Sequence, residues 1–165
     1  MYTRVIKPRH GPTLLVRPLA RGDVATVSAV FQRLGERSRR ARFNGPKPCL
    51  TADELQQLAA VDASHHALVA YVEGDPQPVA IARLARNDHS SAEIAFAVAD
   101  AYQHRGIGSA LAAELISDAR AAGITEITAL ASSDNPATLA LLRRTTDVVD
   151  VQFEGPELSI RAAIA

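Results

Sequence analysis

The sequence has little cysteine and few aromatic residues, and it lacks long apolar runs. Its single cysteine, Cys49, cannot form an internal disulfide, which fits a reducing compartment such as the cytoplasm. Aromatic residues make up only 4% of the chain, and they do not alternate with basic residues as on surfaces that bind single-stranded nucleic acid. No apolar run approaches the roughly 20 residues of a membrane-spanning helix. We therefore expect a soluble, cytoplasmic protein.

The sequence also lacks an excess of positive or of negative side chains. Eighteen basic and eighteen acidic residues give a formal net charge of +0, so neither nucleic acid nor an anionic membrane is expected as a partner. Any anion site must be local. His65 and His66 adjoin an expected strand without further cysteine or histidine ligands, so no metal is predicted. Residues 1–165 are 47% hydrophobic, enough for one domain with a single core, as a monomer or a homodimer.

What the chain does contain is a regular order of patterned segments, separated by turn clusters. The order is one strand, three helices, three strands, helix, strand, helix and two strands. Thr51 and Glu54 have capping-box spacing, Asp23 is a predicted N-cap, and Gly123 ends the fourth helix. This order predicts an α/β (α+β) fold, with helices on both faces of a mixed, mostly antiparallel twisted sheet of about six to seven strands. The predicted strands cover residues 13–19, 66–73, 78–86, 91–99, 124–132, 148–154 and 157–164, and the helices start near Asp23 or cover residues 38–43, 51–60, 108–122 and 136–144.

Residues 103–109 read QHRGIGS and open the fourth helix. The free N–H groups and the dipole of a helix start favour anions, and Gly106 and Gly108 let a ligand approach the backbone closely. His104 and Arg105 add charge, and the arrangement suits a pyrophosphate. A Walker loop would need Gly-Lys-Ser/Thr, and a dinucleotide fingerprint would need a glycine near Leu111, so both are disfavoured. The glycines could also serve only to make a tight strand-to-helix turn.

Residues 103–108 match the Gln/Arg-x-x-Gly-x-Gly/Ala motif of the GNAT N-acetyltransferase superfamily. Upstream, SRRARF (38–43), NGPKP, LTADEL and VDASHHALVAYV resemble the catalytic domains of bacterial Pat-type protein lysine acetyltransferases. The resemblance implies the GNAT fold, acetyl-CoA as cosubstrate and a protein lysine as acceptor. It also implies that the backbone around the motif holds the acetyl-CoA pyrophosphate, through Gln103, His104, Arg105, Gly106, Ile107, Gly108 and Ser109.

Acetyl transfer to an amine requires a neutral nucleophile, and deprotonating a free lysine at pH 7 costs roughly 4 to 5 kcal/mol. Glu93 is the only acidic residue of the strand SAEIAFAVA, and alternation places it on an alanine-rich face, opposite Ile94 and Phe96. If partly buried there, its pKa would rise toward neutrality, which suits a general base. The resemblance assigns this role to the AEIAF segment. The alternative is a strand-end glutamate that faces water.

The resemblance further implies that the strand of Glu93 splays from residues 126–132 and that the pantetheine arm lies in the gap. The Val98 N–H would polarise the thioester carbonyl, flanked by Ala99 and Asp100. Asn135 would contact the pantetheine, cap the next helix, or both.

Two features leave alternatives open. The usual tyrosine general acid of the family is replaced by Leu142, so the acid is unassigned, and water would protonate the leaving thiolate. An acceptor that is a small amine, or a non-catalytic acyl-CoA-binding module, remains a competing hypothesis. The basic run Arg37, Arg39, Arg40 and Arg42 either guides an acidic substrate loop, or pairs with the phosphate of the adenosine, or forms a solvated helix face with Arg42 and Phe43 packing.

Overall fold

The computed structural model of the chain describes residues 2–164; residues 1 and 165 of the predicted domain lie outside that part. One sheet of eight strands has the order β1-β2-β3-β4-β5-β6-β8-β7. All neighbouring strands are antiparallel except β5 and β6, which are parallel. The strands are β1 Arg4–Ile6, β2 Leu14–Pro18, β3 His65–Val72, β4 Pro78–Arg86, β5 Ser91–Val98, β6 Glu126–Ser132, β7 Asp147–Glu154 and β8 Glu157–Ala163.

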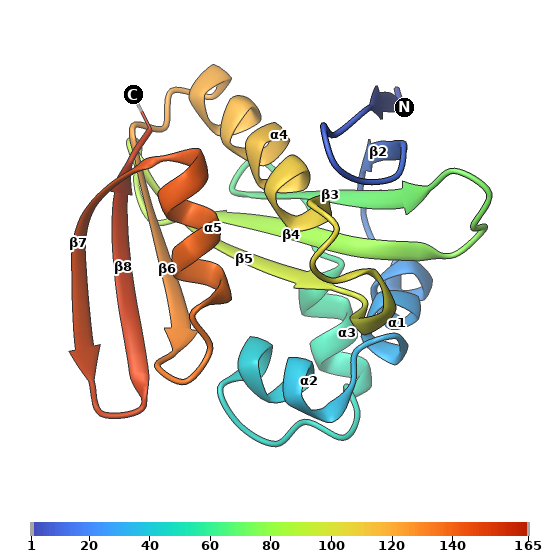
Figure 1. The fold of residues 1–165 in the computed structure, drawn as a ribbon, viewed down its shortest axis with the longest axis horizontal. Coiled ribbons are helices and arrows are strands. Elements are labelled where there is room, and N and C mark those ends of the chain that lie inside the picture. Colours follow the sequence, from blue (N-terminus) through green and yellow to red (C-terminus); the bar gives the residue numbers. More distant parts are fainter. Residues whose placement is uncertain (1, 165) are drawn as a thin grey trace.

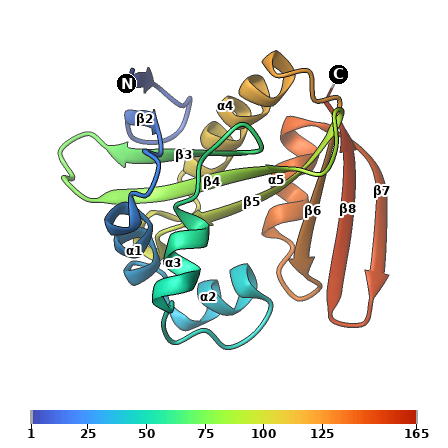
Figure 2. The same ribbon diagram turned by 180° about the vertical axis from the view of Figure 1, so that it is seen from behind.

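The helices cover both faces of this sheet (Figures 1 and 2). α4 and α5 pack on one face, and α1, α2 and α3 lie on the other. The predicted fold class is confirmed, with one strand more than expected. The extra strand, β1, has only three residues, too few for an alternating pattern to be recognised. The helices are α1 Val24–Gln32, α2 Glu36–Phe43, α3 Ala52–Leu58, α4 Ile107–Ala121 and α5 Ala137–Thr145, with a 3₁₀ turn η1 at Asp100–Tyr102.

Local chemistry explains where these helices start. The Asp23 carboxylate accepts the Thr26 N–H at 3.0 Å before α1. Thr51 and Glu54 form both bonds of the predicted capping box before α3. Both predicted caps are therefore confirmed, and each satisfies backbone N–H groups that a helix start leaves without partners.

The two faces of the sheet bury separate apolar clusters. The larger cluster lies under α4 and α5, and the smaller one lies under α1 and α3. β5 contributes to both, because Ile94, Phe96 and Val98 pack in the larger cluster and Ala97 packs against the smaller one. The predicted alternation along β5 is thereby confirmed.

The parallel pair β5 and β6 separates soon after it begins. Its register covers only Ser91, Ala92 and Glu93 opposite Glu126, Ile127 and Thr128, although both strands continue beyond these residues. Figure 1 shows the two strands diverging below α4 and α5. The predicted splay is thus present, and it leaves the facing edges of residues 94–98 and 129–132 without strand partners on that side.

Candidate functional site

The first turn of α4 presents a row of free amides. Within residues 2–164, no backbone N–H of residues 104–109 donates to a protein acceptor, and the first bond of the helix runs from Ala110 to Gly106. His104 and Gly106 both adopt left-handed backbone angles, with φ of 60° and 77°. This conformation favours glycine and is uncommon for histidine. The turn has the geometry expected of an anion site.

A polar cluster fixes the segment just before this turn. The Tyr102 hydroxyl donates to Asp75 at 2.6 Å, and the Arg33 guanidinium donates to the same carboxylate at 2.9 Å. Arg33 also lies 5.1 Å above the Tyr102 ring. The bonds from Tyr102 and Arg33 hold the pKa of Asp75 at about 2, below its ordinary value of 3.8. The turn is therefore held by side chains from α1 and from the loop before β4.

Gln103, predicted to bind cofactor, uses its side chain within the protein. Its amide nitrogen donates to the Ser38 hydroxyl at 2.9 Å and to the Val98 carbonyl at 3.0 Å. These bonds tie the turn to α2 and to the end of β5. The Gln103 side chain thus positions the turn of residues 104–109 at the start of α4.

Basic groups surround the same helix start. His104 and Arg105 are exposed, as predicted, and Arg105 lies 5.4 Å above the Tyr102 ring. Sequence reasoning missed Arg144, at the end of α5, which donates to the Ser109 hydroxyl at 3.2 Å. Helical spacing was the available signal. Arg144 lies one turn after the apolar residue Leu141, which is buried, so both residues lie on the same side of α5.

At the end of β5, the backbone direction is set by the bond from the Ala99 N–H to the Val79 carbonyl, at 2.8 Å. Because successive strand amides point to opposite sides, the Val98 N–H points away from β4, toward the gap left by β6. Ala99 is fully buried. The Asp100 carboxylate lies against Gly35, where an added Cβ would be 2.4 Å from its Oδ2. Of the two residues predicted to flank Val98, Ala99 is therefore buried, and Asp100 packs against Gly35 in the following turn.

Glu93 is the last residue of β5 that pairs with β6, opposite Thr128. Its side chain is exposed, which corresponds to the alternative of a glutamate that faces water and not to a partly buried base. Alternation decides the face on which Glu93 lies, but only tertiary packing decides what covers that face. The predicted alanine-rich face is correct.

Two arginines lie on the Glu93 side of the sheet. Arg83 of β4 donates to the carbonyls of Gln57 and Leu58, at the C-terminal end of α3, where a cation is favoured. Arg42 of α2 is largely enclosed, and burial, reinforced by Arg83 and opposed by Glu93, lowers its pKa to about 10. Arg42 also lies 5.0 Å above the Phe43 ring, so the expected packing of these two residues is present.

Asn135 lies one residue before Pro136, the N-cap position of α5, and its side-chain oxygen accepts the Ala137 N–H at 3.3 Å. Leu142, in the place of the usual tyrosine, is 1% exposed and packs in the larger core cluster. All three tyrosines of the sequence use their hydroxyls elsewhere. Tyr102 donates to Asp75, and the others accept bonds from Arg4 and Arg17. No tyrosine hydroxyl is thus free to serve the gap between β5 and β6.

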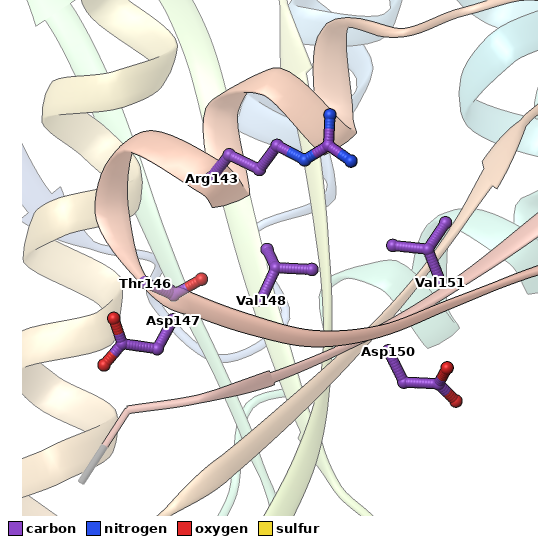
Figure 3. A pocket seen from close by; sticks show the side chains of 6 residues that line it. All are labelled: Arg143, Thr146, Asp147, Val148, Asp150 and Val151. Atoms are coloured by element: carbon purple, nitrogen blue, oxygen red, sulfur yellow. The ribbon is translucent and has the colours of Figure 1, made fainter.

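An open pocket of about 490 Å³ lies between the end of α5 and β7 (Figure 3). It contains none of the predicted site residues, and its lining consists of Arg143, Thr146, Asp147, Val148, Asp150 and Val151. Residues 2–164 hold no group of three or more histidine, cysteine, aspartate or glutamate side chains placed to bind a metal ion. Among the described helices, none has the length and apolar character needed to span a membrane.

Comparison with known sequences identifies the class of protein to which this geometry corresponds. The model of the acetyltransferase (GNAT) family matches residues 32–146. Acetyltransferase Pat of Mycolicibacterium smegmatis is 35% identical over 143 residues, which cover 84% of this chain and 42% of that protein. The chain therefore spans less than half the length of this curated relative.

Solved structures agree on the fold. The GNAT domain of S. lividans PAT superposes with a TM-score of 0.86 at 24% identity, covering 98% of this chain and 96% of that one. The structure of yncA from Salmonella typhimurium, determined with its cofactor acetyl-CoA, superposes with a TM-score of 0.65 at 19% identity, covering 91% and 92%.

Proposed function

Because this chain belongs to the acetyltransferase (GNAT) family, we propose that it transfers the acetyl group of acetyl-CoA to the side-chain amine of a protein lysine. The observation that carries the proposal is the row of unpaired amides at residues 104–109, which follow the end of β5 that is not paired with β6. A long ligand with a diphosphate and an extended arm fits these two features together. Residues 1–165 would act as a single catalytic domain.

In this proposal, the amides of residues 104–109 hold the diphosphate, aided by the helix dipole and by Arg105. The pantetheine arm lies between β5 and β6, and Asn135, which follows the end of β6, contacts it. Unpaired backbone groups of β5 are available to the arm there. The Gln103 side chain keeps the turn in place through Ser38 and the Val98 carbonyl.

Acetyl-CoA supplies an activated acyl carbon, and the protein supplies a base and an oxyanion donor. Glu93 takes a proton from the acceptor ammonium, directly or through a water, and exposure gives it access to a bulky acceptor. The Val98 N–H donates to the carbonyl oxygen as negative charge develops on it. The new bond joins the amine nitrogen to the acyl carbon and the carbon–sulfur bond breaks. The second proton of the attacking nitrogen passes through water to the leaving thiolate.

Protein lysine is the favoured acceptor because of the similarity to Acetyltransferase Pat and because Glu93 is exposed rather than set in a closed pocket. A small amine would need an enclosed site around Glu93. A module that binds acyl-CoA without turnover would need only the phosphate turn and the gap.

The Glu93→Gln variant tests the proposal. We expect kcat to fall by about 10² to 10³, in the range of a lost general base, while acetyl-CoA affinity stays nearly unchanged, because the variant alters no group at the phosphate turn. Release of CoA thiol with candidate proteins and amines measures the first quantity, and calorimetry measures the second. Glu154→Gln, an exposed glutamate on β7, is the matched control and should keep full activity.

Full activity of Glu93→Gln would contradict the base assignment. Acetyl-CoA binding without thiol release from any acceptor would favour the non-catalytic module. Release with small amines but not with proteins would favour the small-molecule alternative.

A further inference from the structure

We infer that the loop of residues 7–13, between β1 and β2, forms a second anion site that binds the 3′-phosphate of the CoA ribose. The inference rests on the proposed function, because it concerns another part of the same cosubstrate. This segment, residues 7–13, is the basic loop. Figure 1 shows this loop beside the start of α4.

The basic loop touches the phosphate turn through its backbone. A Cβ added at Gly11 would lie 2.2 Å from the carbonyl oxygen of Arg105, a distance that real side chains do not tolerate. A Cβ added at Gly106 would lie 3.0 Å from the carbonyl oxygen of His10. The two segments are therefore packed backbone to backbone, which requires glycine at Gly11. Residues that are far apart in the sequence, such as Gly11 and Arg105, thus form one surface.

That surface concentrates positive charge in a protein whose formal net charge is +0. Lys7, Arg9 and His10 of the basic loop are exposed, as are His104 and Arg105 across the contact. None of the ion pairs formed within residues 2–164 includes any of these five side chains. Lys7, Arg9 and Arg105 are like charges that these pairs do not neutralise, and they repel one another, so the cluster favours an anion between its members.

Two prolines flank Arg9 and His10 of the loop. Pro8 and Pro12 fix their own φ angles near −65° and so limit the conformations of the segment between them. A stiff loop loses less conformational entropy on binding, which favours a preformed site.

The chemistry of CoA supplies a matching group. Besides its diphosphate, CoA carries a phosphomonoester on the ribose, which holds close to two negative charges near neutral pH. The amides of residues 104–109 suffice for the diphosphate, so the ribose phosphate needs other donors. Arg144 is the rival cation at this helix start, but its guanidinium already donates to Ser109.

The test compares acetyl-CoA with its 3′-dephospho analogue by calorimetry on the full chain. For the unmodified protein, we expect acetyl-CoA to bind roughly tenfold more tightly, as a charge-assisted contact would provide. In the Lys7→Gln/Arg9→Gln double variant, affinity for acetyl-CoA should fall by about the same factor, while affinity for the analogue stays constant. Arg21→Gln, which removes an exposed arginine at another turn, is the control and should keep the preference.

A second variant moves the loop without removing charge. Gly11→Ala forces the basic loop away from the Arg105 carbonyl, so the preference for the 3′-phosphate should also be lost. Gly74→Ala, at a loop position with φ of 90° and nothing within 4 Å, is its control and should behave as the unmodified protein does.

Equal affinity of the unmodified protein for the two ligands would overturn the inference and leave the proposed function intact. A preference that survives in the double variant but disappears in Arg144→Gln would also overturn it and move the site to α5. Absence of any acetyl-CoA binding by the unmodified protein would overturn the proposed function as well.

Discussion

Asp75 joins two parts of the chain that support the phosphate turn. It accepts bonds from Tyr102, two residues before His104, and from Arg33 at the end of α1. The Arg105 guanidinium lies above the Tyr102 ring. By holding Tyr102, the Asp75 carboxylate therefore indirectly positions Arg105 at the turn. At the scale of single residues, the site depends on such supporting bonds as much as on the residues that face the ligand.

The pKa of Asp75 gives a pH prediction. The pKa of Asp75 in the folded protein is about 2, below the ordinary 3.8. The ionised carboxylate therefore stabilises the fold at pH values above about 4. This contribution is lost as pH falls from about 4 through about 2. We expect the urea midpoint of the unmodified protein to fall more steeply over this range than that of Asp75→Asn. The exposed Asp53→Asn variant should follow the unmodified protein, and equal slopes for Asp75→Asn would refute the prediction.

At the scale of elements, α4 has glycines in left-handed conformation at both ends. Gly106, with φ of 77°, precedes the helix, and Gly123, with φ of 80°, follows it. The first faces the carbonyl of His10 and the free amides, whereas the second has nothing within 4 Å. Both positions need a left-handed backbone conformation, but their surroundings differ.

This difference makes a matched pair of variants. Gly106→Ala and Gly123→Ala should each lose about 1 kcal/mol of unfolding free energy, because alanine is strained in the left-handed region. Only Gly106→Ala should weaken acetyl-CoA binding, since it shifts the turn against His10. Thermal unfolding and calorimetry measure the two effects. Equal affinities in both variants would argue against the ligand lying at the start of α4.

At the scale of the whole molecule, the sheet is continuous at one end of β5 and β6 and open at the other. Only residues 91–93 of β5 join the two halves by strand pairing. The open part exposes backbone groups of both strands, and α4 and α5 bridge it on one face. A ligand in the opening would complete the hydrogen bonding of the strand edges.

Hydrogen exchange tests this arrangement. Acetyl-CoA should slow amide exchange at Phe96, Val98 and residues 104–109, because these amides have no partner in the free protein. Amides in the centre of β3, such as that of buried Leu68, already have strand partners and should change less. A uniform slowing across the chain would instead indicate only the global stabilisation that any bound ligand produces.

The local features of this protein were predictable from its sequence because they depend on neighbouring residues. Alternation located the strands, the Asp23 and Thr51 caps located two helix starts, and the glycines of residues 103–109 located the anion site. These signals come from backbone chemistry over a few residues. The three-residue β1 was missed because so short a strand has no period.

Tertiary structure alone decided the rest. The exposure of Glu93 depends on what other elements pack over its face of the sheet, and the point at which β6 diverges depends on packing between distant strands. The contacts of Arg144 with Ser109 and of Gly11 with Arg105 join residues far apart in the chain. Side-chain periodicity determines which face a residue occupies, but only the assembled sheet determines what covers that face and which charges gather beside it.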